Sequence, residues 1–413
     1  MNAAPRGQIT TQQTVLMILI FFATTLNYVD RQVLALLKPT LQAEFHWSDS
    51  DFANLGVAFQ LSAMFTLILV GWFVDRFGVR FAYGAAVAMW SLAGIGHAVS
   101  RTIPQFIIAR ISLSVAESVN TPAAVKASAI YMPLTARSIS LGIVNTAPNI
   151  GAIITPLVIP AFAVTYGWHA AFIVTGSLGF VWLAFWILGT RKLVPIVPVK
   201  LGSRPRVDWR DLLSDPRTWT VAGAKALTDQ VWWFMLFWMP DFFSKVFHLS
   251  QAQLGGPTAV AFTMAALGAL TSGLLFPALL RFGFGINGAR KLSMAFFACL
   301  ILPLPFALYV ASPWVAALLI GLGLFAHQGF STNVFGLAAD IVPAQRVGSV
   351  MAVGGIAGNL TGSGILKLTG WLLVAKIGYW PIFALASVSY LLATLFVHLM
   401  LPVIRAAATE ASV

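Results

Sequence analysis

The chain has 413 residues, of which 59% are hydrophobic and 9% charged, and its formal net charge is +12. Soluble domains carry roughly 25% charged residues, so this composition excludes a soluble globular protein and indicates an all-α membrane protein with many spans. The basic residues concentrate in alternate loops, as the positive-inside rule predicts, so the positive charge indicates topology and contact with anionic lipid rather than nucleic-acid binding.

Twelve apolar segments are long enough to cross a bilayer, which takes about 20 helical residues. Six precede a polar loop rich in arginine, lysine and proline, and six follow it. We therefore expect an N-terminal six-helix bundle over 1–190, a cytoplasmic linker over 191–217 and a C-terminal six-helix bundle over 218–413, with both termini cytoplasmic. Cys299 is the single cysteine and is interpreted as a small buried residue. The expected spans are 15–37, 52–74, 81–99, 104–126, 137–162, 170–190, 219–244, 257–280, 290–310, 313–337, 346–373 and 379–404.

The first span contains the run Asn27-Tyr28-Val29-Asp30-Arg31. A charged side chain at bilayer depth costs roughly 2.5–3.5 kcal/mol on insertion scales. Such residues are rarely present for stability, so we expect Asp30 and Arg31 to line a water-filled path and to bind a charged solute or a proton.

The loop after the second span carries a glycine, an Asp-Arg pair, a second glycine and a basic residue at fixed spacing. This pattern resembles the loop signature of the major facilitator superfamily. The resemblance implies a membrane fold of 12 transmembrane helices in two pseudosymmetric six-helix bundles, which alternate access by rocking. The loop would act as a conformational latch, with its aspartate accepting from an arginine or a helix N-terminus. The corresponding loop of the second half, residues 273–291, has no acidic residue, so we expect no such latch there. The latch residues are Gly71, Asp75, Arg76, Gly78 and Arg80.

The fourth span carries Arg110 and Glu117, which are seven residues apart and therefore share a helix face. Together with the first span, it supplies two arginines and two carboxylates. These groups either bind an anion and protons or form permanent internal ion pairs without a transport role. The second interpretation is weaker, because buried ion pairs usually cost about as much as they return.

Both charged stretches resemble the anion:cation symporter family, whose members carry organic anions. The segments 227–240 and 326–333 look most like its hexuronate-transporter branch. The resemblance implies that the two arginines face the substrate carboxylate and that the two acids are the protonation sites. The arginines are Arg31 and Arg110, and the acids are Asp30 and Glu117.

Further polar and aromatic residues are candidates for binding the hydroxyl groups and ring of a sugar acid. Asn359 matches a substrate-contacting position of the family. Ala63 stands where the family has a tyrosine and Pro148 where it has a glutamine, so sugar recognition is expected to differ from that of the galactonate carrier. The other candidates are Asn145, Asn149, Gln328, Asn333, Trp232 and Trp233.

Two features of the second half have alternative interpretations. Lys225 and Asp229 are four residues apart in the seventh span, so they either form an intrahelical pair or line the cavity. His327 either relays protons or is a hydrogen-bonded packing residue, which we favour. The remaining histidines have no ligand-like spacing, so we expect no metal and no cofactor.

The function that we infer is proton-coupled import of a monosaccharide acid, a hexuronate such as glucuronate or galacturonate, through the inner membrane of a bacterium by a monomer. The alternative is a transporter of another organic anion, such as an aldonate, an aldarate or an aromatic carboxylate, working by efflux or exchange. A membrane-embedded enzyme would need paired acid and base groups or a metal set near a membrane face. It is disfavoured because the acids of this chain lie at mid-helix beside arginines, and because the sequence has neither a glycine-rich phosphate loop nor a histidine cluster. A transporter-like sensor that does not transport is a further minor alternative, slightly favoured over the enzyme.

Overall fold

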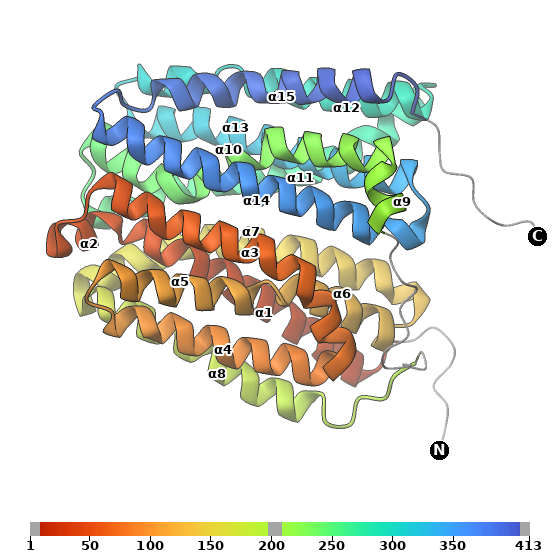
Figure 1. Cartoon of the computed structure of the whole chain (residues 1–413), viewed down its shortest axis with the longest axis horizontal. Coiled ribbons are helices and arrows are strands. Elements are labelled where there is room, and N and C mark those ends of the chain that lie inside the picture. Colours follow the sequence, from red (N-terminus) through yellow and green to blue (C-terminus); the bar gives the residue numbers. More distant parts are fainter. Residues whose placement is uncertain (1–8, 197–208, 405–413) are drawn as a thin grey trace, which may run out of the picture. The chain divides into compact units, whose positions relative to one another are not determined.

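The structure is a computed structural model that describes residues 9–196 and 209–404, apart from some side chains at the starts of two helices. The described part is helical and contains no strand (Figure 1). The all-α fold class predicted from composition is therefore confirmed. The helices of the first half are α1 (Thr11–Leu36), α2 (Lys38–Phe45), α3 (Asp49–Phe77), α4 (Val79–Val99), α5 (Ile103–Glu117), α6 (Asn120–Tyr131), α7 (Leu134–Tyr166) and α8 (Trp168–Gly189).

The second half repeats this pattern of long apolar helices. Its helices are α9 (Trp209–Ser214), α10 (Pro216–Phe247), η1 (Gln251–Gln253), α11 (Gly255–Arg281), α12 (Ile286–Leu300), η2 (Leu304–Leu308), α13 (Pro313–Ile341), α14 (Ala344–Val374) and α15 (Trp380–Met400).

Every predicted span falls on helical structure, and ten helical segments of the described chain are long and apolar enough to cross a membrane. The predicted fourth span is not one helix, because the α-helical pattern is interrupted after Glu117. There Ser118 and Val119 form the turn between α5 and α6. The predicted ninth span is α12 followed by the short helix η2.

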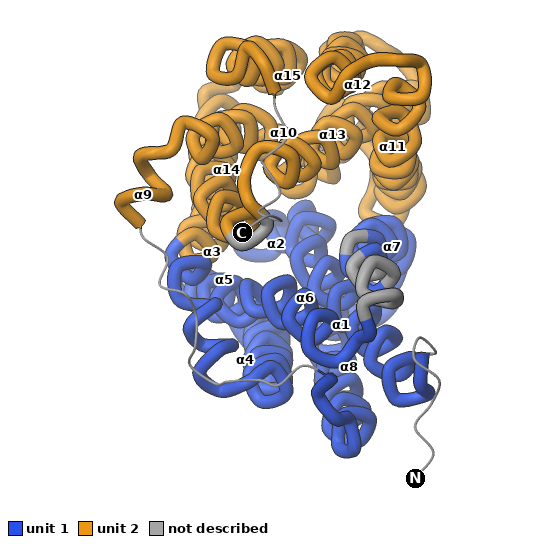
Figure 2. The backbone as a smooth tube through the Cα atoms, turned by 90° about the vertical axis from the view of Figure 1, so that its right-hand side faces the viewer, with its two compact units in different colours: residues 1–46, 65–204 blue, residues 47–64, 205–413 orange. Residues whose placement is uncertain are grey.

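The chain divides into two compact units (Figure 2). Unit 1 comprises residues 1–46 and 65–204, and unit 2 comprises residues 47–64 and 205–413. Helix α3 is therefore divided: its first half packs with unit 2 and its second half with unit 1. The sequence divided the chain instead into bundles at 1–190 and 218–413, which keep the whole helix in the first bundle.

Polar contacts hold the first half of α3 within unit 2. The carboxylate of Asp49 accepts from the Lys245 ammonium of α10 at 2.6 Å, and Lys245 also pairs with buried Asp241 at 3.3 Å. Lys367 of α14 donates to Asn54 of α3 at 2.6 Å. These contacts anchor the first two turns of α3 to α10 and α14.

Close packing in unit 1 depends on small residues. Helices α4 and α8 approach so closely that a Cβ added to Gly94 would lie 3.3 Å from Gly176 Cα, and one added to Gly179 would collide with the Ser91 side chain. Small residues permit this kind of close approach between membrane helices, where side-chain packing takes the place of hydrophobic driving force. Trp182 and Trp186 stack on each other beside Tyr83 and complete the interior.

Helices α10 and α14 of unit 2 pack through a regular set of glycines. Gly354, Gly358 and Gly362 of α14 recur every four residues and therefore lie on one face of the helix. A Cβ at these positions would collide respectively with Lys225, Asp229 and Trp233 of α10, which also recur every four residues. Three side chains of α10 thus fill three gaps left by glycine.

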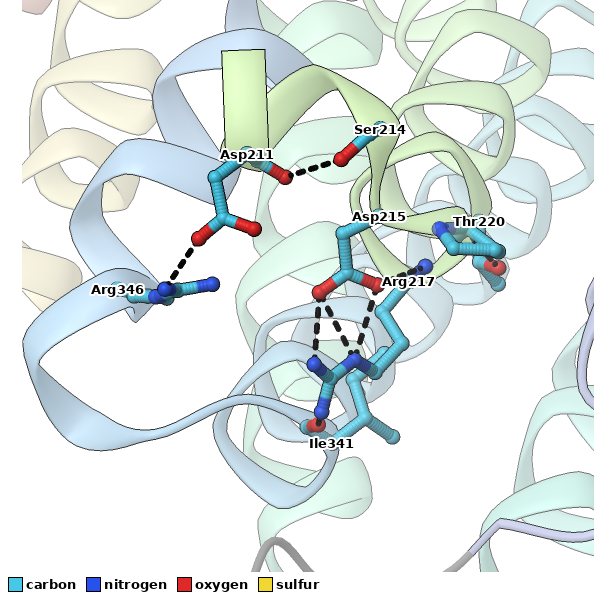
Figure 3. Close-up of polar contacts among 8 residues, drawn as sticks. Asp211, Ser214, Asp215, Arg217, Thr220, Ile341 and Arg346 are labelled. Carbon is cyan, nitrogen blue, oxygen red and sulfur yellow. Dashed lines mark hydrogen bonds and ion pairs between the residues drawn. The ribbon is translucent and has the colours of Figure 1, made fainter. Parts of the chain in front are cut away.

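A network of charged residues ties the short helix α9 to the longer helices of unit 2 (Figure 3). Asp211 of α9 pairs with Arg346 near the start of α14. Asp215 caps α10 by accepting from the backbone N–H of Arg217, and it also pairs with the Arg217 guanidinium at 2.7 Å. That guanidinium donates to the Ile341 carbonyl at the end of α13 at 3.0 Å, so α9, α10, α13 and α14 are linked at one end.

One prediction about a single side chain is wrong. Cys299 is exposed on α12 instead of being buried. Its position in an apolar segment does not distinguish a core-facing side chain from one on the outer face of a membrane helix, since both faces are apolar.

Candidate functional site

An ion pair between the first and fourth predicted spans forms the centre of the site in unit 1. Arg31 of α1 donates through Nε to Glu117 Oε2 at 2.8 Å. The Glu117 side chain is fully buried, whereas that of Arg31 keeps 17% of its surface exposed. Glu117 is the last residue of α5, and Asn27 Nδ2 donates to its backbone carbonyl at 3.5 Å where the helix breaks.

The other two predicted charges lie beside this pair. Asp30 and Arg110 are 5% and 2% exposed, and both interact electrostatically with Glu117 and with each other. The Thr175 hydroxyl of α8 lies next to the Asp30 carboxylate. The structure thus brings together all four charged residues that the sequence singled out in the first and fourth spans.

The two oxygens of Glu117 differ in their contacts. Oε2 accepts from Arg31, whereas Oε1 is buried and has no hydrogen-bond partner among the described residues. A buried carboxylate oxygen without a donor is costly unless it binds a proton or gains a partner. A proton on Oε1 would therefore break no hydrogen bond among the described residues.

Unit 1 also contains buried neutral polar side chains that were not assigned from the sequence. Tyr83 of α4 donates its hydroxyl to Asn120 Oδ1 at 2.6 Å, and Thr24 of α1 lies 3.4 Å from the Asn120 amide. Gln32 is 2% exposed, and its side-chain amide has no hydrogen-bond partner among the described residues. Asn120 and Gln32 stand next to the charged motifs, and this proximity is the one signal that could have identified them.

Lys225 and Asp229 of α10 form the ion pair that their spacing allows, at 2.6 Å. Their side chains are 12% and 16% exposed, so the pair is only partly shielded. The Lys225 ammonium also lies 5.5 Å from the centre of the Phe335 ring of α13. The intrahelical-pair interpretation thus describes this geometry, and the residual exposure leaves one edge of the pair accessible.

His327 lies in the core of unit 2 as a packing residue. Its Nδ1 and the Tyr390 hydroxyl form a hydrogen bond of 2.6 Å, and Trp232 stacks on the ring at a centroid distance of 5.1 Å. Trp232 is 7% exposed. This tryptophan supports the histidine and is buried in the core.

Asn333 is fully buried, and its amide is saturated by neighbours in unit 2. Its Nδ2 approaches the Ser272 and Ser293 hydroxyls at 2.9 Å each, while its Oδ1 accepts from Arg290 at 3.2 Å. Arg290 in turn pairs with Asp340 at 2.7 Å. We therefore interpret Asn333 as part of a structural network.

The remaining candidates differ in accessibility. Asn149 is 8% exposed, and Asn359 is half-buried and donates to the Gly355 carbonyl of its own helix at 2.9 Å. Gln328 and Trp233 are also half-buried. The side chain of Asn145 lies outside the described part of the structure.

The predicted latch loop lies at the junction of α3 and α4. Gly78 has a positive φ of 77° and caps α4, which explains the need for glycine there. Asp75 pairs with Lys126 of α6, and Lys126 also donates to the Val74 carbonyl at 3.2 Å. Arg80 donates to the Ile187 carbonyl of α8 at 3.4 Å. Gly71 is half-buried and Arg76 is exposed.

One partner of Asp75 is thus a lysine of the same unit, and the predicted contact with an arginine or a helix N-terminus stays a prediction. In the second half, the Arg290–Asp340 pair joins the start of α12 to the end of α13. Its acid lies outside the loop 273–291, where the sequence showed none, so this pair was missed. Within residues 9–196 and 209–404, no group of three His, Cys, Asp or Glu side chains is placed to hold a metal ion.

Comparisons with known proteins cover nearly the whole chain. Residues 20–366 match the family described as the Major Facilitator Superfamily. The hexuronate transporter of Escherichia coli strain K12 is 26% identical over 402 residues, which cover 93% of this chain and 92% of that protein. The D-galactonate transporter of Escherichia coli O6:H1 is 26% identical and covers 90% of this chain and 91% of the relative. The galacturonate transporter of Dickeya chrysanthemi is 26% identical over 72% of this chain and 91% of its own length.

Two solved structures have the same fold. A bacterial homologue of the human lysosomal transporter Spinster, in an inward-facing and unoccupied conformation, matches with a TM-score of 0.74 at 18% identity, covering 95% of this chain and 96% of that one. A D-xylose–proton symporter matches with a TM-score of 0.71 at 16% identity, covering 93% and 97% of the two chains. At these identities the likeness concerns the fold alone.

Proposed function

The chain belongs to the Major Facilitator Superfamily and is a multi-pass membrane transporter rather than an enzyme, and from this premise we propose that it imports a monosaccharide acid together with protons. The substrate class is the hexuronates, such as glucuronate and galacturonate. The named relatives that match over most of the chain are transporters of hexuronate, galactonate and galacturonate, which supports this substrate class. All three are sugar acids with one carboxylate and several hydroxyl groups.

The observation that carries the proposal is the buried ion pair between Arg31 and Glu117, with Arg110 and Asp30 beside it. A guanidinium group binds a carboxylate through two parallel hydrogen bonds, which a lysine cannot do. The Arg31 side chain is 17% exposed, whereas Arg110 is 2% exposed, so Arg31 is the arginine that an incoming carboxylate can reach. Arg110 then balances the charge of the acids that remain.

Competition for Arg31 would couple the substrate to the proton. When the substrate carboxylate binds Arg31, Glu117 loses its direct counter-charge in a buried site. A buried carboxylate without a partner is neutralised by a proton, because burying an isolated charge is costly. Oε1 already lacks a donor among the described residues and would accept that proton. Each ligand then favours binding of the other, as thermodynamic linkage requires.

The sugar hydroxyls would be bound by the candidates that remain partly accessible. Gln328 and Asn359 offer amides, and Trp233 offers an aromatic face, since all three are half-buried. Asn149 and Asn145 are further amide candidates of α7. We propose that the protein acts as a monomer in a bacterial inner membrane with both termini cytoplasmic.

The test is uptake of labelled glucuronate and galacturonate into proteoliposomes that contain the purified chain. An inward proton gradient is imposed, with and without a protonophore. Accumulation that the protonophore abolishes, and that galactonate inhibits only weakly, supports the proposal. If neither uronate is taken up while another carboxylate is transported, the uronate assignment fails and the alternative of a transporter for a different organic anion is adopted.

A further inference from the structure

Unit 1 contains a long apolar groove that the proposed transport site does not use. The groove has a volume of about 910 Å³ and is formed by α1, α7 and α8. Its walls include side chains that are about half exposed, among them Phe22 of α1, Val158 of α7 and Phe185 of α8. A space of this size matches that of ordinary ligand pockets, which run roughly from 300 to 1,000 Å³.

The groove offers no free polar group to a water-soluble ligand. None of the three threonine hydroxyls in its wall is free. Thr25 donates to the Phe21 carbonyl and Thr155 to the Gly151 carbonyl, while the Thr175 hydroxyl contacts the Phe172 carbonyl and the Asp30 carboxylate. The indole N–H of Trp182 donates to the Leu19 carbonyl at 2.7 Å. A sugar acid would lose its own hydrogen bonds to water here without replacement, whereas a hydrocarbon chain would lose none.

One end of the groove carries positive charge. Leu188 and Gly189 form the wall where α8 ends, and a Cβ at Gly189 would lie 2.9 Å from Val15 near the start of α1. Arg191 and Lys192 follow directly and are exposed. Neither side chain has an acidic partner among the described residues. Adjacent cations at the end of an apolar groove complement the phosphate of an anionic phospholipid.

We propose that this groove is a binding site for an anionic phospholipid, phosphatidylglycerol, with one acyl chain between α1, α7 and α8 and the phosphate on Arg191 and Lys192. The apolar walls select an acyl chain, and the two cations select an anionic headgroup. A zwitterionic lipid shares the acyl chain but gains less from the cations.

The groove shares helix α1 and Thr175 with the proposed transport site, so its occupant would affect transport. Helix α1 presents Ile18, Phe22, Leu26 and Val29 to the groove, while Asp30 and Arg31 take part in the charged cluster. Thr175 is shared, because it lines the groove and lies next to the Asp30 carboxylate. A lipid chain packed on α1 would therefore restrict movement of the helix that carries the ion pair. This consequence rests on the proposed function, whereas lipid binding itself does not.

Photolabelling tests the site on the delipidated full-length chain in detergent. Phosphatidylglycerol carrying a diazirine in one acyl chain is added, and labelled residues are mapped by mass spectrometry. Labels on groove-lining residues of α1, α7 and α8 are expected. Labels confined to other helices would overturn the proposal, and because this measurement uses the unaltered chain, misfolding of a variant cannot confuse it.

Variants separate headgroup binding from chain binding. In Arg191→Gln/Lys192→Gln, groove labelling by phosphatidylglycerol should need a roughly 30-fold higher lipid concentration, because two basic contacts with an anionic headgroup are lost. Labelling by the phosphatidylcholine analogue should not change. Val181→Trp fills the groove and should reduce labelling by both lipids. Arg281→Gln, which removes an exposed basic residue at the end of α11, is the matched control and should have no effect.

Two results would contradict the proposal: equal labelling of the double variant and the unaltered chain, or unaltered preference for phosphatidylglycerol over phosphatidylcholine in the double variant. Labelling is measured without transport, so it tests the lipid site alone. Loss of labelling would refute the lipid site, whereas loss of uronate uptake with labelling intact would refute only the uronate assignment.

Discussion

At the scale of single residues, the proposed proton coupling depends on Glu117. Replacing Glu117 with Gln removes the carboxylate proposed to bind the proton but keeps its size and a carbonyl oxygen for Arg31. We expect this variant to lose accumulation of substrate against a gradient while it retains counterflow exchange, which needs no net proton movement. Both are measured in proteoliposomes with labelled substrate.

The matched control for this variant is Glu44→Gln. Glu44 of α2 accepts from the indole N–H of Trp168, a bond that a glutamine oxygen can also accept. Accumulation should therefore be unaffected. If Glu117→Gln still concentrates substrate, Glu117 is not the proton site and Asp30 becomes the remaining candidate.

Arg31 should need its guanidinium group and not its charge alone. Arg31→Lys keeps the positive charge but loses the two-pronged geometry that binds a carboxylate. Losing one hydrogen bond to a charged group costs roughly 1.5–3 kcal/mol, so we expect KM for substrate to rise roughly tenfold to a hundredfold. Arg101→Lys, at an exposed arginine that contacts His169, is the control. An unchanged KM in Arg31→Lys would remove Arg31 from the substrate site.

The four charged residues that the structure brings together in the candidate site were easier to single out in the sequence than the neutral ones. A charge in an apolar span stands out because burial there is costly, so Asp30, Arg31, Arg110 and Glu117 could be identified. Asn333 has an amide like those of Asn149 and Asn359, and no pattern reveals that its neighbours saturate it. Hydrogen-bond saturation depends on which helices are adjacent, and one sequence does not specify that.

At the scale of elements, the contact between α10 and α14 depends on Gly358. In Gly358→Ala the added Cβ would lie 2.3 Å from Asp229 Oδ2 and 3.0 Å from Asp229 Cβ, so either the Asp229 side chain must leave its place or the helices must separate. Overpacking of this kind costs roughly 1–3 kcal/mol, and we expect a lower thermal unfolding temperature for the purified protein. Gly364→Ala on the same helix is the control, since nothing lies within 4 Å of its added Cβ.

The control variant Gly364→Ala should even be slightly more stable than the unaltered chain, because alanine favours the helix over glycine by roughly 0.8–1.0 kcal/mol. Opposite changes at the two positions would show that packing, and not helix propensity, determines the effect. Equal stability of the two variants would mean that α10 and α14 can move apart without loss.

The cap of α10 should make unfolding sensitive to acid. Burial alone would raise the pKa of Asp215. The hydrogen bonds from the Arg217 side chain and backbone, drawn in Figure 3, and the positive charges of Arg217 and Arg346 have a larger effect than burial. The pKa of Asp215 is therefore lower than its usual value. The ionised form therefore stabilises the fold above the unfolded pKa, which is roughly 3.9, and this contribution is lost as pH falls through the lower folded pKa.

Asp215→Asn keeps a capping side chain but removes the charge. We expect it to unfold at a lower temperature than the unaltered chain at pH 7, by a free energy of about 1 kcal/mol. The difference should narrow as the pH falls below roughly 4. Thermal unfolding at several pH values measures this, and a difference that stays constant with pH would exclude the charged cap as its cause.

The break between α5 and α6 illustrates why element boundaries were less predictable than element existence. Every predicted span is helical, because a long apolar run has few alternatives in a bilayer. No proline or glycine marks the turn at Ser118 and Val119; Pro122 comes later, inside α6. The break instead coincides with Asn27, whose amide contacts the Glu117 carbonyl freed there, and that partner comes from another helix.

At the scale of the whole molecule, the first half of α3 is grouped with unit 2 by specific contacts that can be tested. Asp49→Asn removes the carboxylate that binds Lys245. A partly exposed pair contributes roughly 0–1 kcal/mol, so hydrogen exchange of residues 49–64 should accelerate by up to roughly fivefold while residues 65–77 are unaffected. Lys376→Gln, at an exposed residue after α14, is the control. An equal acceleration of hydrogen exchange along all of α3 would show that the Asp49–Lys245 contact does not hold its first half specifically.

The superfamily fold was predictable from the order of spans and the loop from Gly71 to Arg80, and the comparisons confirm it. The grouping of residues 47–64 with unit 2 was not predictable from the sequence. It depends on long-range contacts that join α10 and α14 to α3. Lys245 contacts Asp49, which is 196 residues earlier in the chain, and Lys367 contacts Asn54, which is 313 residues earlier. A division by sequence order groups α3 with the helices next to it along the chain, whereas these contacts group its first half with unit 2.

The Cys299 thiol, on the outer face of the apolar helix α12, gives the native chain one attachment point for a membrane-permeable spectroscopic probe. Cys299 is the sole cysteine of the sequence, so a maleimide dye or spin label would mark unit 2 at one known residue without prior removal of other thiols. A second cysteine placed on an exposed position of unit 1 would then define one distance between the two units. A change in that distance on adding uronate or acid would show that the two units move in response to the proposed substrate or proton, in a chain that differs from the natural one by a single substitution.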